Sequence, residues 1–188
     1  MRPRPAACPH ARHGADPTTR PHPTDGSLDR VLIESRTTKD AELLAMVTAQ
    51  QVELAGLEGD GHISFPLYEQ IEYLVGVLDG ERDGDGSGDG AAFGAAVACG
   101  ALQALEPGVG EVKRMYVRPA YRGRGLSRIM LAAVEKLAAQ RGIHILRLET
   151  GRVYDAALGL YTSSGYSEIP LYGQYVGHPL SICFEKRL

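Results

Sequence analysis

The stretch of chain from residue 111 to residue 150 constrains the fold more than any other part of the sequence. It predicts a strand over 111–117, a glycine-rich turn, a helix over 126–141 and a second strand over 144–150. The apolar face of that helix consists of Leu126, Ile129, Met130, Ala133 and Leu137. A strand, a helix and a strand in this order form a βαβ crossover, whose two strands lie parallel in one sheet. The sequence therefore predicts an α/β fold, which some schemes count as α+β.

Hydrophobic patterning extends this sheet in both directions along the chain. Further strands are expected at 31–35, 73–78, 92–105, 166–169 and 181–186. A first helix, capped by Thr38 or Asp40, is expected to place on its apolar face Leu43, Leu44, Val47 and Leu54. A short helical stretch is expected around 67–71, and a later helix over 154–163.

The first 28 residues differ in composition from the rest of the chain. They hold six of the eleven prolines and three of the six histidines, and almost nothing that a core could bury. This composition predicts a disordered tail over 1–28, in which His10, His13 and His22 are solvated. The remaining residues, 29–188, are expected to form one domain, because 44% of the 188-residue chain is hydrophobic.

Cysteine spacing and hydrophobic runs argue against several classes of protein. Cys8, Cys99 and Cys183 are too few and too scattered for a disulfide framework or a cysteine metal site. No apolar run reaches the roughly 18 residues of a membrane span. No apolar segment follows the basic start of the chain, so a secretory signal is not expected. We expect a cytoplasmic protein with no metal and no membrane partner.

An acidic, glycine-rich stretch at 79–90 resembles a calcium loop only superficially. Asp83 and Asp85 alternate as in an EF-hand, whose twelfth position must be a bidentate glutamate. That position is Gly94 when counted from Asp83 and Gly90 when counted from Asp79. We therefore expect a flexible acidic hairpin loop between two strands.

Basic residues gather around the glycine-rich turn. The chain between Val112 and Val134 has no acidic residue and carries Lys113, Arg114, Arg118, Arg122, Arg124 and Arg128. A cluster of one sign favours an anionic ligand even though the net charge is −3; a solvated surface without a ligand is the alternative. The net charge argues against a dedicated DNA-binding protein.

The turn over 122–127, Arg-Gly-Arg-Gly-Leu-Ser, has the features of a phosphate-binding loop. Its glycines let several backbone N–H groups point at one spot, and the helix that follows adds partial positive charge. A Walker loop does not fit, because the Gly-x-x-x-x-Gly-Lys pattern is absent. The dinucleotide fingerprint does not fit either, because Arg128 stands where it needs a third glycine.

Arg122-x-x-Gly125-x-Ser127 resembles the Gln/Arg-x-x-Gly-x-Gly/Ala signature of the GNAT acyl-CoA N-acyltransferases. Residues 111–119 look like the fourth strand of that family. Residues 156–166 look like its later helix, which usually ends Leu-Tyr-x-x-x-Gly-Phe. The resemblance covers about residues 30–188 and implies the GNAT fold. That fold has a central mixed twisted sheet of about six to seven strands, about four flanking helices and a βαβ unit that binds CoA.

The resemblance implies which residues bind acetyl-CoA. The backbone of the turn binds the pyrophosphate, and the strand before it binds pantetheine and the thioester through its main chain. The residues implied are Met115, Tyr116, Val117, Arg122, Gly123, Arg124, Gly125, Leu126, Ser127 and Tyr154. Two of them depart from the family pattern: Ser127 replaces a glycine or alanine, and Tyr154 stands where many members have asparagine.

The resemblance also implies two catalytic residues. Glu111 matches the general-base glutamate of some members, and period-two counting places its side chain on the same face as that of Val117. Tyr161 matches the tyrosine that protonates the CoA sulfur. The alternatives are an ion pair between Glu111 and a nearby arginine, and packing of Tyr161 between helix and sheet.

The acceptor site of family members is shaped by the segments that correspond to 56–68 and 171–179. The candidate residues there are Phe65, Tyr68, Tyr172 and Tyr175. Their rings could frame an apolar or cationic acceptor, or they could pack the turns. His178, just before Pro179, is expected to be a loop residue rather than a catalyst.

The function that the resemblance implies is an acetyl-CoA-dependent N-acetyltransferase acting on a small primary amine. Acetylation of a peptide or protein amine, a longer acyl group, and a non-catalytic acyl-CoA sensor are the alternatives. Glu111 and Tyr161 argue against the sensor, because binding alone needs neither of them. The resemblance also implies a homodimer, and no nucleic-acid partner is expected.

Overall fold

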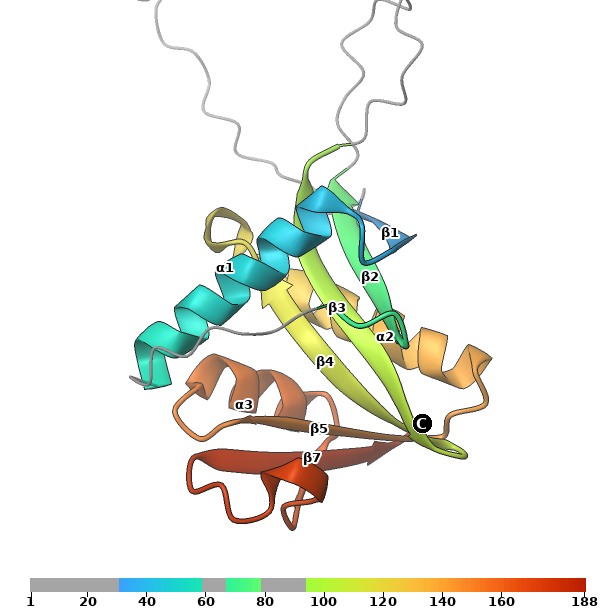
Figure 1. The fold of residues 1–188 in the computed structure, drawn as a ribbon, viewed down its shortest axis with the longest axis vertical. Coiled ribbons are helices and arrows are strands. Elements are labelled where there is room, and N and C mark those ends of the chain that lie inside the picture. The colour runs from blue at the N-terminus through green and yellow to red at the C-terminus, as the bar shows by residue number, and fades with distance from the viewer. Residues whose placement is uncertain (1–30, 59–66, 79–93) are drawn as a thin grey trace, which may run out of the picture.

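The structure is a computed structural model that describes residues 31–58, 67–78 and 94–188. Three expectations from the sequence lie outside the described residues: the tail over 1–28, the acidic loop over 79–90, and Phe65. The described part of the chain forms one sheet with helices on both faces (Figure 1).

Seven strands form a single mixed sheet in the order β1-β2-β3-β4-β5-β7-β6. The strands are β1 (Val31–Arg36), β2 (Ile71–Leu78), β3 (Ala96–Glu106), β4 (Val109–Val117), β5 (Ile145–Gly151), β6 (Ser167–Ile169) and β7 (Ser181–Arg187). β4 and β5 lie parallel, whereas every other neighbouring pair is antiparallel. The parallel pair is joined through α2 (Leu126–Gln140), so the predicted βαβ crossover and α/β fold are confirmed.

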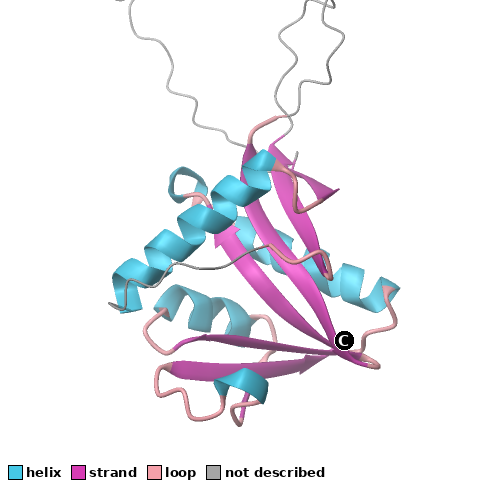
Figure 2. Ribbon diagram, in the orientation of Figure 1, coloured by secondary structure: helices cyan, strands magenta, loops and turns pink. Residues whose placement is uncertain are grey.

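Helices cover both faces of the sheet (Figure 2). The other two helices are α1 (Ala41–Glu58) and α3 (Asp155–Ser163). α1 packs on one face, where Leu43 and Met46 join a buried cluster with residues of β2 and β3. α2 and α3 pack on the other face, where Met130 and Tyr161 belong to a larger cluster. The sheet therefore separates two hydrophobic cores.

Asp40 holds the first turn of α1. Its Oδ1 accepts a hydrogen bond from the Leu43 N–H at 2.8 Å, and its Oδ2 lies 2.8 Å from the Arg36 guanidinium. An aspartate in this place satisfies one of the N–H groups that a helix start leaves without a partner. Of the two predicted caps, Thr38 and Asp40, the structure selects Asp40.

Two sequence expectations near α1 and β2 are wrong. Leu44 is 51% exposed, because α1 turns only the stripe that contains Leu43 and Val47 toward the sheet. The segment 67–71 contains no helix, since Ile71 already belongs to β2 and pairs with β3. Pairing in the sheet overrides the local helical propensity there.

The buried face of α2 is rotated slightly from the predicted one. Leu131 and Val134 are fully buried, whereas Ile129 and Ala133 are only partly buried at its border. The buried stripe is therefore shifted toward the side of α2 that carries Leu131 and Val134. The described residues contain three α-helices, where the resemblance implied about four.

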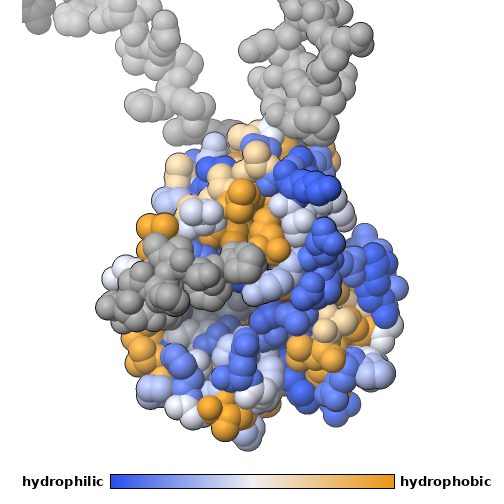
Figure 3. Space-filling model, in the orientation of Figure 1, coloured by the Kyte–Doolittle hydropathy of each residue, from blue (hydrophilic) through white to orange (hydrophobic). Residues whose placement is uncertain are grey.

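The surface carries scattered apolar side chains. Leu44 and Val52 on α1 are half-exposed, and hydrophobic side chains are visible where α1 crosses the sheet (Figure 3). Single exposed residues of this kind are usual on protein surfaces. Within the described ranges, no helix is both long enough and apolar enough to cross a membrane.

Replacing two neighbouring leucines of α1 tests the assignment of its buried stripe. Leu43→Ala removes a fully buried side chain and is expected to lower the free energy of unfolding by about 2–5 kcal/mol. Leu44→Ala, at a half-exposed position, is expected to change it by less than about 0.5 kcal/mol. Urea denaturation measures both values, and equal losses would contradict the orientation of α1.

Candidate active site

β4 and β5 lie side by side for only part of their length and then separate (Figure 1). Their last pair joins Glu111 to Arg147. Both strands run on, β4 to Val117 and β5 to Gly151. Beyond the last pair, the two edges that face each other have no ladder hydrogen bonds between them. Backbone groups at such an opening need other partners.

Side chains from elsewhere in the fold occupy part of the open edge of β4. The Met115 carbonyl accepts a hydrogen bond from Gln50 Nε2, and the Val117 carbonyl accepts one from Arg122 Nε, each at 2.9 Å. On the opposite edge, the N–H of Arg118 donates to β3. Because backbone groups alternate along a strand, Met115 and Val117 direct theirs into the opening. The structure thus places these two predicted acetyl-CoA contacts along it.

A bulge in β4 changes which side chains face the opening. Arg114 has a φ of 54°, and the register between β3 and β4 shifts beside it. Val112 and Val117 both pack in the core beneath α2, so Glu111, next to Val112, points to the opposite face. The prediction that Glu111 and Val117 share a face is wrong, because the extra residue of a bulge reverses the alternation.

The glycine-rich turn leads into the N-terminus of α2. Gly123 and Gly125 have φ angles of 75° and 78°, a left-handed conformation that favours glycine. Gly125 is the N-cap, and no side chain of the described residues caps the helix there. The N–H groups of the first turn, which includes Ser127, therefore lack an intrahelical acceptor. Leu126 is buried and anchors the turn in the core. A helix start of this kind suits an anion.

The two arginine side chains of the turn contact the protein itself. The Arg122 guanidinium forms an ion pair with Glu53 of α1 at 2.7 Å and lies 5.5 Å from the centroid of the Tyr116 ring. The Arg124 guanidinium lies 5.6 Å from the centroid of the Tyr121 ring. Arg122 thus ties the turn to α1, which leaves the backbone N–H groups of the turn as the candidates for binding an anion. The sequence contained no signal for Glu53, because only the fold brings α1 to this turn.

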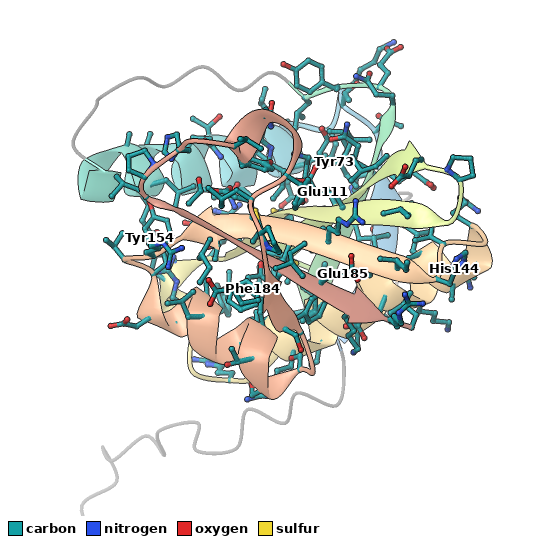
Figure 4. The ribbon with its side chains drawn as sticks, turned by 90° about the horizontal axis from the view of Figure 1, so that it is seen from below. Tyr73, Glu111, His144, Tyr154, Phe184 and Glu185 are labelled. Atoms are coloured by element: carbon teal, nitrogen blue, oxygen red, sulfur yellow. The ribbon has the colours of Figure 1, made fainter. Side chains whose placement is uncertain are left out.

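Tyr154 bridges the start of α3 and α1 (Figure 4). Its hydroxyl donates to the Leu54 carbonyl at 3.5 Å. Its ring covers Gly151, where a Cβ atom would lie 2.6 Å from a ring carbon. The close approach of the ring therefore requires glycine at position 151. This predicted acetyl-CoA contact lies at the open end of β5.

Glu111 is a buried carboxylate at the closed end of the opening, and it is only 3% exposed. Its Oε1 accepts hydrogen bonds from the hydroxyls of Tyr172 and Tyr175, each at 2.9 Å. Its Oε2 lies 2.8 Å from the Lys113 ammonium. A buried charge needs such partners. The ion-pair partner within the described residues is Lys113, where the sequence had suggested an arginine.

The same network holds cations against aromatic rings. Lys113 Nζ lies 5.7 Å from the centroid of the Tyr175 ring, and the Arg147 guanidinium lies 5.6 Å from that of Tyr172. Burial would lower the pKa of Lys113, but the hydrogen bond and charge of Glu111 outweigh it and raise the pKa. Burial and the charge of Glu111 raise the pKa of both tyrosines. At neutral pH, an ammonium and two neutral hydroxyls therefore surround the carboxylate.

Tyr68 lies at the rim of this network. It is 44% exposed, and its backbone N–H donates to the Tyr73 hydroxyl at 3.1 Å. Burial lowers the pKa of Arg114, and nearby tyrosines, among them Tyr68 and Tyr175, oppose this shift. The structure thus brings three of the four predicted acceptor residues to one side of the opening.

Tyr161 lies in the core formed with α3, and it is 6% exposed. The centroids of the Tyr166 and Phe184 rings lie 5.8 and 6.4 Å from that of Tyr161. Burial and the charge of Glu149 raise the pKa of its hydroxyl. Tyr161 is therefore protonated at neutral pH, as a proton donor must be. It lies on the face of the sheet opposite to Glu111.

The model of the Acetyltransferase (GNAT) family matches residues 39–166. The chain belongs to the GNAT acetyltransferase family. The family and the fold that the turn over 122–127 implied are therefore confirmed.

Similar proteins and solved structures agree with this family assignment. A candidate acyl-CoA N-acyltransferase from Klebsiella pneumoniae has 34% sequence identity and a TM-score of 0.65, and the match covers 84% of this chain and 97% of that one. An IAA acetyltransferase from Azospirillum brasilense is 40% identical over 93 residues, 49% of this chain and 61% of the relative. The chain thus spans less than two thirds of the length of the curated relatives it matches. A GNAT family acetyltransferase from Elizabethkingia anophelis, with acetyl-CoA bound, shares the fold at 14% identity; its TM-score is 0.59, and the match covers 85% of this chain and 99% of that one.

Removing single hydroxyl groups tests the network around Glu111. Tyr172→Phe and Tyr175→Phe each delete one donor to the buried carboxylate and are expected to lower the free energy of unfolding by about 1–3 kcal/mol. Tyr121→Phe is the control, because that ring lies beneath Arg124 in another part of the site. It is expected to change the value by less than about 0.5 kcal/mol. Free energies of unfolding come from urea denaturation curves, and curves of Tyr172→Phe and Tyr175→Phe that coincide with that of Tyr121→Phe would contradict the network.

Proposed function

We propose that the protein is an acetyl-CoA-dependent N-acetyltransferase that acts on the primary amine of a small molecule. The observation that carries this proposal is the opening between β4 and β5. The N-terminus of α2, which no side chain of the described residues caps, follows the open end of β4, and the buried Glu111 stands at the closed end. An anion-binding helix start, an unpaired backbone edge and a carboxylate thus follow one another along a single strand and its turn.

The residues at the opening fit the parts of acetyl-CoA, which supplies the activated acetyl thioester. The backbone N–H groups of 123–127 are proposed to bind the pyrophosphate. The backbone groups of Met115 and Val117 are proposed to bind the pantetheine arm and to orient the thioester. Tyr154 borders the same end of β5 and is proposed to contact the cofactor there. Tyr116 takes part through its ring, which supports Arg122.

The setting of Lys113 supports an amine as the acceptor. Its ammonium contacts Glu111 Oε2 at 2.8 Å and the Tyr175 hydroxyl at 3.1 Å. A substrate ammonium would find the same partners there, a carboxylate, a hydroxyl and an aromatic ring. We propose that the acceptor binds beside Glu111, framed by Tyr68, Tyr172 and Tyr175. Glu111 then takes its proton, directly or through a water.

Tyr161 is the proposed general acid. Its hydroxyl keeps its proton at neutral pH, because burial and the charge of Glu149 raise its pKa. Glu111 and Tyr161 lie on opposite faces of the sheet, and the opening between the strands separates them. One side chain can therefore remove a proton from the amine while the other gives a proton to the departing sulfur. The cytoplasmic location and the homodimer stay predictions from the sequence.

A negative charge in the first turn of α2 tests the proposed pyrophosphate site. Ser127→Glu is expected to weaken CoA binding about tenfold or more, because its carboxylate competes with the pyrophosphate for the same N–H groups. A glutamate in a first turn favours the helix itself, so thermal stability should not fall. Isothermal titration calorimetry with CoA measures the affinity, and Lys136→Glu near the other end of α2 is the control. Equal affinities for the two variants would contradict the site.

The catalytic assignments are tested by thiol release from acetyl-CoA over a panel of amines, amino acids, polyamines, aminoglycosides and peptides. IAA is included because the Azospirillum brasilense relative is named after it. With an accepted amine, Glu111→Gln and Tyr161→Phe are each expected to lower kcat about 10²–10⁴-fold. Glu72→Gln, in an exposed ion pair with Arg141, and Tyr121→Phe are the controls.

Two outcomes would count against these assignments. Wild-type rates in Glu111→Gln or Tyr161→Phe would remove that residue from the mechanism. Tight CoA binding without turnover on any member of the panel would favour the acyl-CoA sensor instead.

A further inference from the structure

One turn of α1 contacts the edge of β4 that faces the opening, and the proposed function gives this turn no role. Gln50 Nε2 donates to the Met115 carbonyl at 2.9 Å. Glu53 forms an ion pair with Arg122 at 2.7 Å, and Arg122 Nε donates to the Val117 carbonyl at 2.9 Å. α1 therefore holds both carbonyls, one directly and one through an arginine.

The same turn of α1 also contacts the other side of the opening. The Leu54 carbonyl accepts a hydrogen bond from the Tyr154 hydroxyl, at the start of α3, at 3.5 Å. Residues three and four apart lie on one face of a helix, so Gln50, Glu53 and Leu54 share a face of α1. Figure 1 shows α1 crossing the open end of β4 toward α3. The last turns of α1 thus bridge β4 and the segment that follows β5.

The two halves of α1 are held in different ways. The buried cluster beneath the helix contains Leu43, Met46 and Val47 from its first turns. Among the described residues, that cluster takes no member from α1 after Val47, and the contacts of the last turns with β4 and the glycine-rich turn are polar. Segments with few buried apolar contacts open at a low cost in free energy. The last turns can therefore leave the sheet while the first turns stay packed.

The Gln50 side chain binds the edge of β4 in the way that a neighbouring strand would. The pantetheine arm contains amide groups, and an amide N–H that pairs with a strand edge donates to its carbonyls. Gln50 Nε2, which donates to the Met115 carbonyl, takes the place of such an amide nitrogen. Gln51 Nε2 donates to Gln50 Oε1 at 3.1 Å, which fixes the Gln50 amide with its nitrogen toward β4. Gln50 and the pantetheine arm thus need the same place at the edge.

We propose that Gln50 and Glu53 form a latch that competes with acetyl-CoA for the edge of β4, so that binding of the cofactor releases the last turns of α1. The inference rests on the proposed binding of the pantetheine arm by Met115 and Val117. Each hydrogen bond that the latch makes to the edge is given up for one that the cofactor makes. The latch therefore lowers the affinity for acetyl-CoA, and the bound cofactor destabilises the end of α1 by the same coupling free energy.

The affinity of Gln50 variants for CoA tests the latch. Gln50→Met keeps the length of the side chain but has no donor for the Met115 carbonyl, and Gln50→Ala removes the side chain. Both are expected to bind CoA about two- to tenfold more tightly than the wild type, the equivalent of one hydrogen bond. Isothermal titration calorimetry measures the affinity, and Gln140→Ala, at the exposed last position of α2, is the matched control. An affinity of Gln50→Met equal to or weaker than that of the wild type would overturn the latch.

Amide hydrogen exchange tests the release of α1. In the wild type, saturating CoA is expected to speed exchange in the last turns of α1, from Gln50 onward, and to leave its first turns unchanged. In Gln50→Met, the last turns are expected to exchange faster already without CoA, and CoA should change them less. A role of Gln50 in stability alone would not make the effect of CoA depend on it. Slower or unchanged exchange at the end of α1 when the wild type binds CoA would contradict the release.

The same measurements separate failure of the latch from failure of the proposed function. A wild-type protein that binds CoA and acetylates an amine, without a gain of affinity in Gln50→Met, would overturn the latch alone. A wild-type protein that binds no CoA would overturn the proposed function and the latch with it.

Discussion

The separation of β4 from β5 is the constraint on which the rest of the site depends. Past the Glu111–Arg147 pair, backbone groups on the inner edge of β4 have no strand to bond to, and buried backbone groups are costly without partners. Gln50 and Arg122 satisfy two carbonyls of this edge, which draws α1 and the turn before α2 toward the opening. What remains at the edge is backbone in an extended conformation, a surface suited to an extended ligand.

The buried charge of Glu111 organises the other side of the opening. A carboxylate that is removed from water must be matched by donors, and Lys113 on the same strand supplies only one of them. Tyr172 and Tyr175 supply the rest from the segment between β6 and β7, at the far edge of the sheet. Their hydrogen bonds hold that segment over β4. The same contacts therefore stabilise the carboxylate and shape the side of the opening where we propose that the acceptor binds.

Sequence reasoning succeeded where the signal is local. The turn glycines Gly123 and Gly125 are in the left-handed region, as a glycine-rich loop before a helix predicts, and the βαβ crossover followed from periodicity. It failed where packing outweighs local preference. The bulge at Arg114 reverses the facing of the residues after it, which period-two counting cannot anticipate. Leu44 continues an apolar pattern on α1, yet the sheet covers only part of that helix.

The sequence by itself determined the α/β class and the glycine-rich turn between a strand and a helix, because both follow from patterns within one continuous stretch of chain, residues 111–150. The tertiary structure alone decided which side chains meet. Glu111 and Tyr172 are 61 residues apart in the chain, and Arg122 and Glu53 are 69 apart. Contacts over such separations follow from the order of strands in the sheet and the packing of α1 across it. No local pattern in the residues themselves encodes that order.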